Sequence, residues 1–368
     1  MDTLVGINLD SIIIKCNTFT MNKLFISLLC FVPLALVAEL FKLPPLLIFF
    51  LSTTAIIPLA RFIGESTEEL STHMGTGLGS ILNATFGNAT EMILAVFAIN
   101  AGLVGVVKAS ITGSIIGNLL LVLGLSIFAG GLRFKKQLFN KTIAQAAGST
   151  MFIALVALVV PAVFLLTSPH IGNPTVNSLS ILVAICMLVV YISSIIFMLV
   201  THKHLYLTKI GKEEANWSVR KGILVLLSST LLVAILSEIL VGTIEPVTKA
   251  LGWTEVFVGV IFLAIIGNAA ENASAILMAV KNKMDLALQI SFGSATQIAL
   301  FVVPVLIIIS FAVGKPMNLI FSVIEIVAIV FSVLISYFVT QDGETHWLKG
   351  LQLVVAYLIM GVVFFLVP

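Results

Sequence analysis

Two glutamates in nearly identical settings are the residues of this chain best suited to chemistry. Glu91 closes the segment Gly87-Asn88-Ala89-Thr90-Glu91, and Glu271 closes Gly267-Asn268-Ala269-Ala270-Glu271; each segment lies inside a long apolar run. A carboxylate near the middle of a membrane span costs roughly 2.5 to 3.5 kcal/mol even on the mild insertion scale. Because the chain bears this cost twice in the same local sequence, we expect the two carboxylates to act together.

The spacing within each segment predicts a cation site. Gly, Asn and Glu stand at i, i+1 and i+4, so a helix places all three on one side. Gly and Asn are poor helix formers, Gly by about 1 kcal/mol against Ala, and an opened turn leaves carbonyls that a bound cation can satisfy. Such an all-oxygen set suits hard cations such as Ca²⁺, which take about six to eight oxygens. No His or Cys lies near either segment, which argues against Zn or Cu.

Two further apolar runs carry a polar stripe each. The first stripe contains Ser110, Gly113, Ser114, Gly117 and Asn118, and the second contains Ser291, Ser294 and Gln297. Small residues also let membrane helices approach closely, so Gly113 and Gly293 fit helix packing as well as a site. Asn118 and Gln297 are larger and more polar, which favours a functional role for them.

The paired carboxylates suggest a coupling mechanism. When the cation leaves, two carboxylates facing each other in low dielectric cannot both remain charged cheaply. We therefore expect the pair to take up protons as a coupled unit. Competition between one divalent cation and protons for the same carboxylates would give antiport.

The composition predicts an all-α polytopic membrane protein to hold these groups. The 368 residues are 60% hydrophobic and 10% charged, with a mean hydropathy of +1.19, whereas soluble domains carry about 25% charged residues. Eleven runs are long enough to span a bilayer: 23–41, 44–64, 76–100, 105–131, 142–166, 177–201, 219–243, 254–280, 286–313, 317–339 and 347–367. The first also resembles a signal peptide ending at Ala38, but we favour a retained span because the topology works with it.

The positive charges predict an orientation. Of the 19 Lys and Arg residues, the side opposite the N-terminus receives only Lys42, Lys108, Lys249 and Lys315. The excess on the other side places the N-terminus and the connector 202–218 in the cytoplasm and the C-terminus outside.

The chain contains an internal repeat. Residues 79–125 align without a gap on 259–305, with identities at the glycines, asparagines and glutamates of both segments and at Gly113/Gly293 and Ser114/Ser294. We expect an N-terminal part, 1–42, with one extra helix, then five-helix repeats at 43–201 and 219–368 joined by 202–218. An odd number of spans per repeat inverts the second copy, as in secondary transporters whose sites lie at the midplane.

Other acidic residues leave alternatives open. Glu65, Glu68 and Glu69, like Glu238 and Glu245, lie near span ends and fit either an ion or proton path or solvated helix ends. Glu325, which we place in the middle of the tenth span, fits a structural hydrogen-bond partner better than a ligand.

Both halves resemble the calcium/proton exchanger (CAX) family of the calcium/cation antiporter superfamily. The resemblance rests on residues 82–91, 265–271, 113–124 and 293–301. It implies an ion site built on Glu91 and Glu271, with carbonyls around Gly87 and Gly267 as ligands beside Asn88 and Asn268. It also implies direct or water-mediated contacts from Ser114, Asn118, Ser294 and Gln297, and the one-plus-five-plus-five helix plan.

We therefore expect a Ca²⁺/H⁺ antiporter of a prokaryotic cell membrane, with Ca²⁺ and H⁺ as substrates, the lipid bilayer as partner, and no cofactor or nucleic acid. The connector 202–218 is short and mostly basic, unlike the acidic segment of many eukaryotic relatives, so calcium regulation through it is not expected. A Na⁺/Ca²⁺ exchanger is the nearest alternative and a passive cation channel a more distant one. An enzyme is disfavoured, since no nucleophile–base or metal-ligand arrangement occurs.

Overall fold

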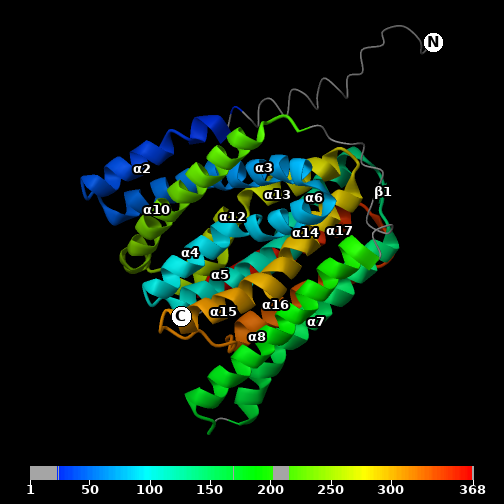
Figure 1. Ribbon diagram of the computed structural model, residues 1–368. Coiled ribbons are helices and arrows are strands. Elements are labelled where there is room, and N and C mark those ends of the chain that lie inside the picture. Colours follow the sequence, from blue (N-terminus) through cyan, green and yellow to red (C-terminus); the bar gives the residue numbers. More distant parts are fainter. Residues whose placement is uncertain (1–22, 24, 169, 202–214, 367–368) are drawn as a thin grey trace, which may run out of the picture.

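The computed structural model describes residues 23, 25–168, 170–201 and 215–366, and these residues are almost entirely helical (Figure 1). Most of the predicted connector, residues 202–214, lies outside them. The elements in chain order are α2 (Phe31–Leu40), α3 (Pro45–Phe86), α4 (Ala89–Asn100), α5 (Val104–Ile116), the π-helix η1 (Gly117–Val122), α6 (Leu123–Arg133), β1 (Gln137–Leu138), α7 (Lys141–Thr167), α8 (Asn173–Ile196), η2 (Phe197–Thr201), α10 (Val219–Leu251), α11 (Glu255–Phe257), η3 (Val258–Leu263), α12 (Ala264–Gly267), α13 (Ala269–Val280), α14 (Met284–Gln297), η4 (Ile298–Val302), α15 (Val303–Ala312), α16 (Val323–Thr340), β2 (Glu344–Thr345) and α17 (Trp347–Leu366).

Capping residues explain several helix ends. The Asn140 side chain accepts a hydrogen bond from the Thr142 backbone N at 3.0 Å at the start of α7, and Ser218 accepts one from Lys221 N at 3.3 Å at the start of α10. These side chains satisfy backbone donors that a helix leaves unpaired. Gly252 ends α10 with φ 66°, a left-handed conformation that glycine adopts without a Cβ penalty.

Long apolar helices make the fold that of an integral membrane protein. Among the described residues, eight helices are long and apolar enough to cross a membrane, or up to nine if the bent pair Glu255–Gly267 and Ala269–Val280 counts as one span. Two shorter apolar helices, Phe25–Leu40 and Ala89–Asn100, accompany them. Between their first and last turns, helices of this length satisfy their backbone groups internally, as a bilayer demands.

Helix α3 covers parts of two predicted spans without an interruption in its assignment. A Cβ added at Gly79 would lie only 2.5 Å from the backbone O of Ser71. Eight residues of straight helix are about 12 Å long. The chain therefore folds back on itself between Ser71 and Gly79, so its two arms correspond to the predicted spans 44–64 and 76–100, while the second arm continues into α4.

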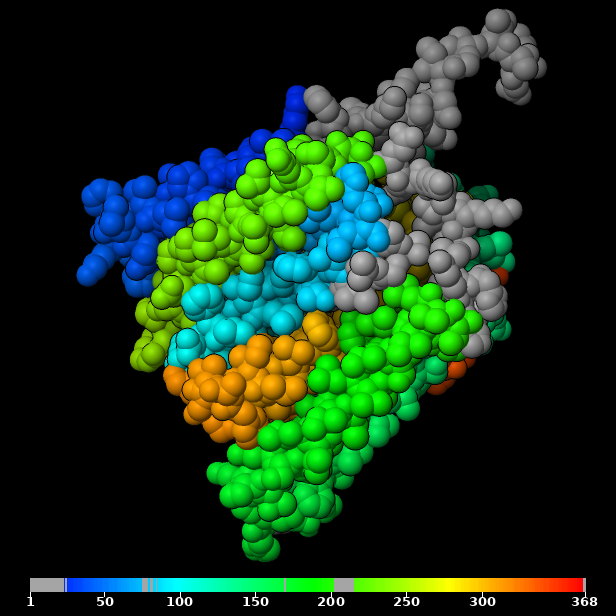
Figure 2. Space-filling view, in the orientation of Figure 1, coloured from blue at the N-terminus to red at the C-terminus, as the bar shows by residue number. Residues whose placement is uncertain are grey.

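The helices gather around a shared interior. Helix α3 packs along α10, with α2 against both, and α4 lies between α10 and α15 (Figures 1 and 2). On the opposite side α7 and α8 pack against α14, α15 and α16. Helix α5 packs on η3, and α17 on α6. Segments from the first and second halves of the chain therefore alternate through the core.

The tenth predicted span begins later than its apolar run. Helix α16 starts at Val323, not at 317, because Met317 and Leu319 belong to a buried loop. Lys108 donates to Asn318 Oδ1 and to the Ile320 backbone O, both at 2.7 Å, and Leu319 N donates to Ser180 Oγ at 3.0 Å. Side chains on α5 and α8 therefore satisfy the loop, and hydropathy alone cannot distinguish such a buried loop from a helix.

Glycines allow α5 and η3 to touch backbone to backbone. A Cβ at Gly113 would overlap the backbone carbonyl of Val260, and a Cβ at Gly259 would lie 2.6 Å from Ala109 Cβ. Around Gly293, the repeat partner of Gly113, a Cβ would meet nothing within 4 Å. The packing role that the sequence left open is therefore present at Gly113 but not at Gly293.

Alanine at these two glycines should have opposite consequences. We expect Gly113→Ala to destabilise the protein by about 1–3 kcal/mol or more, because the opposing atoms belong to the backbone and cannot rotate away. Gly293→Ala should leave the thermal midpoint of the purified protein within error of wild type. Equal midpoints for the two variants in a thermal-unfolding assay would contradict the close approach of α5 and η3.

Three of the five acidic residues near span ends, Glu65, Glu69 and Glu245, make hydrogen bonds or ion pairs. Glu69 accepts hydrogen bonds from the backbone N atoms of Asn216 and Trp217 at 2.7 and 3.0 Å, and so anchors the chain just before α10. Glu65 pairs with Arg61 and Glu245 with Lys249, each at 2.6 Å.

In the loop before α17, a hydrogen bond from Lys349 holds the pKa of the Asp342 carboxyl below its usual range.

Candidate cation site

Both glutamate-containing segments, 87–91 and 267–271, interrupt their helices. Helix α3 ends at Phe86 and α4 begins at Ala89, with Gly87 and Asn88 between them. In the second copy α12 ends at Gly267 and α13 begins at Ala269, with a bend of 63° at Asn268. The opened turn that the residue types predict therefore occurs in both copies. Each glutamate lies in the first turn of the helix that follows the break, where the N-terminal dipole favours negative charge.

Each glutamate packs against the glycine of the other copy. A Cβ at Gly267 would lie 2.7 Å from Glu91 Cγ, and a Cβ at Gly87 would lie 3.4 Å from Glu271 Oε1. The two segments are 180 positions apart in sequence, yet their glutamates cross over one another in the core. The absent side chains of the two glycines supply the room for this crossing.

Three of the four carboxylate oxygens face the interior without protein partners among the described residues, while Ser294 donates a hydrogen bond to the Glu271 carboxyl. Glu91 is only 8% exposed. Among the described residues, no hydrogen-bond partner occurs for Glu91 Oε1 and Oε2, Glu271 Oε2 or Asn88 Oδ1, all of which are buried. A buried acceptor without a partner costs about 1–3 kcal/mol, and more when it is charged. Four such oxygens in one place are suited to receive a proton or a cation.

A hydrogen-bond network joins both segments to the polar stripes. Asn88 donates to Gln297 Oε1 at 2.7 Å, and Asn268 donates to Ser114 Oγ at 3.1 Å. Asn268 Oδ1 in turn accepts from Ser294 at 3.2 Å and from Asn118 at 3.3 Å, and Asn118 also donates to Ser294 Oγ at 2.9 Å. Every bond except that between Ser294 and Asn268 joins a residue of the first repeat to one of the second.

The structure thus brings the ten predicted site residues into one region. Asn88, Ser114, Asn118, Asn268 and Ser294 are all buried. The π-helix η1 begins within the first stripe, at Gly117, and η4 begins directly after the second stripe, at Ile298; π-helical turns often occur at functional sites. The sequence pattern does not reveal these π-helical turns.

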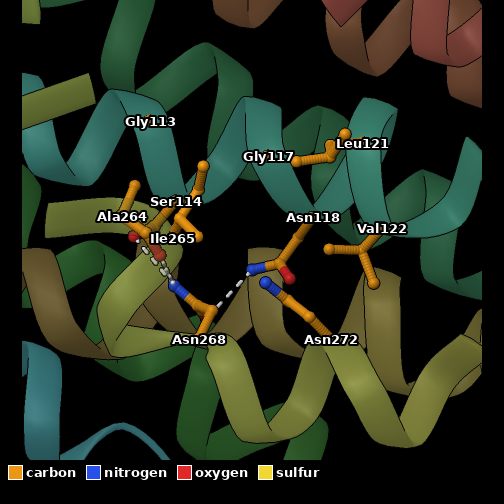
Figure 3. Close-up of a pocket in the computed structure, with 10 residues that line it drawn as sticks. All are labelled: Gly113, Ser114, Gly117, Asn118, Leu121, Val122, Ala264, Ile265, Asn268 and Asn272. Carbon is orange, nitrogen blue, oxygen red and sulfur yellow. Dashed lines mark hydrogen bonds between the residues drawn. The ribbon is translucent and has the colours of Figure 1, made fainter. Parts of the chain in front are cut away.

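A pocket opens beside this network (Figure 3). It is a small hollow lined by residues of α5 and η1 on one side and of α12 and α13 with the break between them on the other: Gly113, Ser114, Gly117, Asn118, Leu121, Val122, Ala264, Ile265, Asn268 and Asn272. Asn272 was not among the predicted site residues. Asn272 directly follows Glu271 in the sequence, and this position could have identified it as a site residue. The comparison of the repeats does not do so, because the equivalent residue in the first copy is Met92.

The donor set differs from that of a resident metal centre. Within the part of the chain that the structure describes, no group of three or more His, Cys, Asp or Glu side chains could hold a metal ion. Two carboxylates surrounded by neutral amide and hydroxyl oxygens can hold a hard cation and can also exchange it for protons. Glu325 plays no part here, because it lies in the first turn of α16, where it caps the helix with Ser322 and accepts from Thr112 at 3.3 Å.

Comparisons with known proteins match nearly the whole chain. A family model described as "Sodium/calcium exchanger protein" matches residues 44–200 and 221–366. The Ca²⁺/H⁺ antiporter ChaA of Bacillus subtilis (strain 168) is 45% identical over 353 residues, which cover 94% of this chain and 100% of ChaA. The Ca²⁺/H⁺ antiporter of Aphanothece halophytica is 43% identical, with 94% and 97% covered. The structure of native YfkE superposes with a TM-score of 0.83 at 42% identity, covering 93% of this chain and 100% of YfkE.

Proposed function

The chain belongs to the sodium/calcium exchanger protein family, as a CAX-type member of the calcium/cation antiporter superfamily, and from this premise we propose that it is a Ca²⁺/H⁺ antiporter. In this proposal it exports Ca²⁺ from the cytoplasm by alternating access. The observation that carries it is the crossing of Glu91 and Glu271 in the core with unpartnered oxygens. The printed names of the relatives support the choice of Ca²⁺ and H⁺.

The two glutamates are the exchange site in this proposal. Carbonyls at Gly87 and Gly267 and the amides of Asn88 and Asn268 complete the oxygen shell. Ser114, Asn118, Ser294 and Gln297 position those amides, directly or through water. The network supports this assignment, since each asparagine is held by a residue of the opposite repeat.

Charge alternation couples the two substrates. Ca²⁺ neutralises both carboxylates when it is bound. Without it the pair loses its compensating charge in a low-dielectric interior, so protons replace the cation. Because one pair serves both substrates, Ca²⁺ and H⁺ cannot cross in the same direction in one cycle, and the result is exchange.

The helix plan of the proposal is one N-terminal helix plus two inverted five-helix repeats. Counting the bent pair as one span gives nine. The second arm of α3 together with α4 adds a tenth, and the apolar helix Phe25–Leu40 adds an eleventh. The N-terminus then lies in the cytoplasm and the C-terminus outside, which agrees with the charge distribution. The pairing of α3 with α10, which begin the two repeats, supports the repeat boundaries.

Flux measurements test the coupling. Purified protein in proteoliposomes should accumulate ⁴⁵Ca²⁺ against its gradient when a pH gradient is imposed and should not do so with a Na⁺ gradient. Uptake driven by Na⁺ alone would make the protein a Na⁺/Ca²⁺ exchanger. Flux that only follows the Ca²⁺ gradient would make it a channel, and either result would overturn the proposal.

A further inference from the structure

We propose that Gln137, in the short strand between α6 and α7, is a positioning residue for Glu271. Its side-chain amide anchors the last turn of α13, the helix whose first turn contains Glu271. That Glu271 serves in cation exchange rests on the proposed function. The anchor itself rests on the contacts of Gln137 and on the sparse packing of α13.

Gln137 is a buried polar side chain that reaches α13. It is 1% exposed, and its Nε2 donates to the Ala279 backbone O at 2.8 Å and to Asn282 Oδ1 at 3.1 Å. The last carbonyls of a helix have no intrahelical donor, and Ala279 O also accepts from Asn282 N at 3.0 Å. The Gln137 amide therefore completes the C-terminal cap of α13.

The surroundings hold Gln137 itself in place. Its strand β1 pairs with β2, where Gln137 lies opposite Thr345. On α6, Gly130 makes room for the amide, because a Cβ there would overlap Gln137 Oε1 and lie 3.1 Å from Ala279 O. The amide therefore ties the end of α13 both to α6 and to the pair of strands.

The side chains of α13 give it little hold on its neighbours. Helices α4 and α13 both have 12 residues and both follow a break at an asparagine. Among the described residues, seven of α4 are buried, including Leu94 and Ile99, but only Ala275 and Ala279 of α13. Two alanines make few of the close contacts by which larger side chains interlock. The position of α13 along its axis therefore depends on the anchor at its end.

A shift at this end reaches the glutamate. Glu271 precedes Ala279 by eight residues of one helix, which is about 12 Å. Since the chain bends at Asn268 directly before α13, the helix can move as a unit about that joint. Releasing its last turn therefore displaces Glu271 from its place beside Glu91.

The second repeat has no such amide at the equivalent position. Helices α6 and α15 begin at positions 123 and 303, the same offset of 180. At this offset Gln137 aligns with Met317, and Gly130 with Ser310. Met317 is buried as well, but methionine has no donor, and its backbone N donates to Ser310 Oγ at 2.8 Å. Exchanging residues between the repeats therefore gives substitutions that remove the anchor specifically.

Calcium binding by the purified full-length protein, measured by calorimetry at fixed pH, tests the anchor. Gln137→Met installs the residue of the other repeat and should raise the dissociation constant about tenfold, as expected for a group misplaced by up to about 1 Å. Asn282→Gly matches Gly102 of the first repeat, keeps the positive φ and removes one acceptor. It should raise the constant about threefold, since the bond to Ala279 remains. The control is Gln145→Met, the same change at an exposed position of α7.

A double-mutant comparison separates positioning from general stabilisation. In a Glu271→Asp background the carboxylate is already withdrawn, so Gln137→Met should have little further effect on Ca²⁺ binding. In a Glu91→Asp background its effect should remain about tenfold. Equal effects in both backgrounds, or a lower thermal midpoint with unchanged Ca²⁺ binding, would make Gln137 a structural residue and overturn the proposal. If Gln137→Met does not fold, Asn282→Gly decides, and wild-type binding by that variant overturns it.

Transport distinguishes a failure of this inference from a failure of the proposed function. In proteoliposomes, Gln137→Met should raise the KM for Ca²⁺ about tenfold with little change in the maximal rate. Proton-driven uptake by wild type together with an unchanged KM in Gln137→Met overturns the anchor alone. Absence of proton-driven uptake in wild type overturns the antiport, and the role of Gln137 in it as well.

Discussion

Replacing either Glu91 or Glu271 with glutamine should abolish proton-driven Ca²⁺ uptake. Glutamine keeps the shape of the side chain but removes one of the two charges that face the cation. Losing one partner of a buried, compensated charge pair costs about 3–5 kcal/mol, which corresponds to roughly a 150- to 4000-fold loss of affinity. We expect uptake by both variants to fall to the level of protein-free vesicles.

Folding should survive these substitutions. Glu91 Oε1 and Oε2 and Glu271 Oε2 have no protein partner among the described residues, and the amide oxygen at position 271 can still accept the hydrogen bond from Ser294. Each amide therefore removes a buried charge without breaking a hydrogen bond. The thermal midpoint should equal that of wild type or exceed it. Glu245→Gln is the matched control, because Glu245 is exposed and paired with Lys249, and it should transport normally. Exchange retained in Glu91→Gln or Glu271→Gln would refute the paired-carboxylate mechanism.

Much of the site follows from residue types and spacing. A Gly-Asn pair inside an apolar run is unfavourable in a helix, so the breaks at Asn88 and Asn268 could be predicted from local propensity. The repeat offset of 180 positions likewise predicts that the two glutamates are equivalent. These properties depend on neighbours in sequence, which is why the pattern reveals them.

The unequal surroundings of the two segments could not be predicted. Asn88 bonds to Gln297, whereas Asn268 bonds to Ser114, although alignment of the repeats pairs Ser114 with Ser294. The partners depend on the length of the Gln297 side chain and on how the helices of the two repeats lie against each other. Both depend on tertiary packing. The same holds for Glu325, which the apolar run 317–339 places in mid-span and the buried loop before Val323 places at a helix start.

The close approach of Gly267 to Glu91 predicts a second loss of function by a different route. In Gly267→Ala the new Cβ would lie 2.7 Å from Glu91 Cγ and 3.1 Å from Cδ. Because the opposing atoms belong to a flexible side chain, the backbone can stay in place while the carboxylate turns away. We expect the protein to fold but Ca²⁺ uptake to fall by about 10- to 100-fold, since misplacing a reacting group by about 1 Å costs that much in preorganised sites.

The measurement is ⁴⁵Ca²⁺ uptake by Gly267→Ala beside that of Gly242→Ala, a glycine of α10 around which a Cβ meets nothing within 4 Å. Shortening the displaced side chain should separate geometry from general damage. In the double variant with Glu91→Asp, the carboxylate withdraws from the new methyl group, so uptake should exceed the product of the two single effects. Wild-type uptake by Gly267→Ala would mean that Glu91 is not held against the opposite repeat. The crossing of the two glutamates, rather than their mere presence, is therefore what this pair of variants tests.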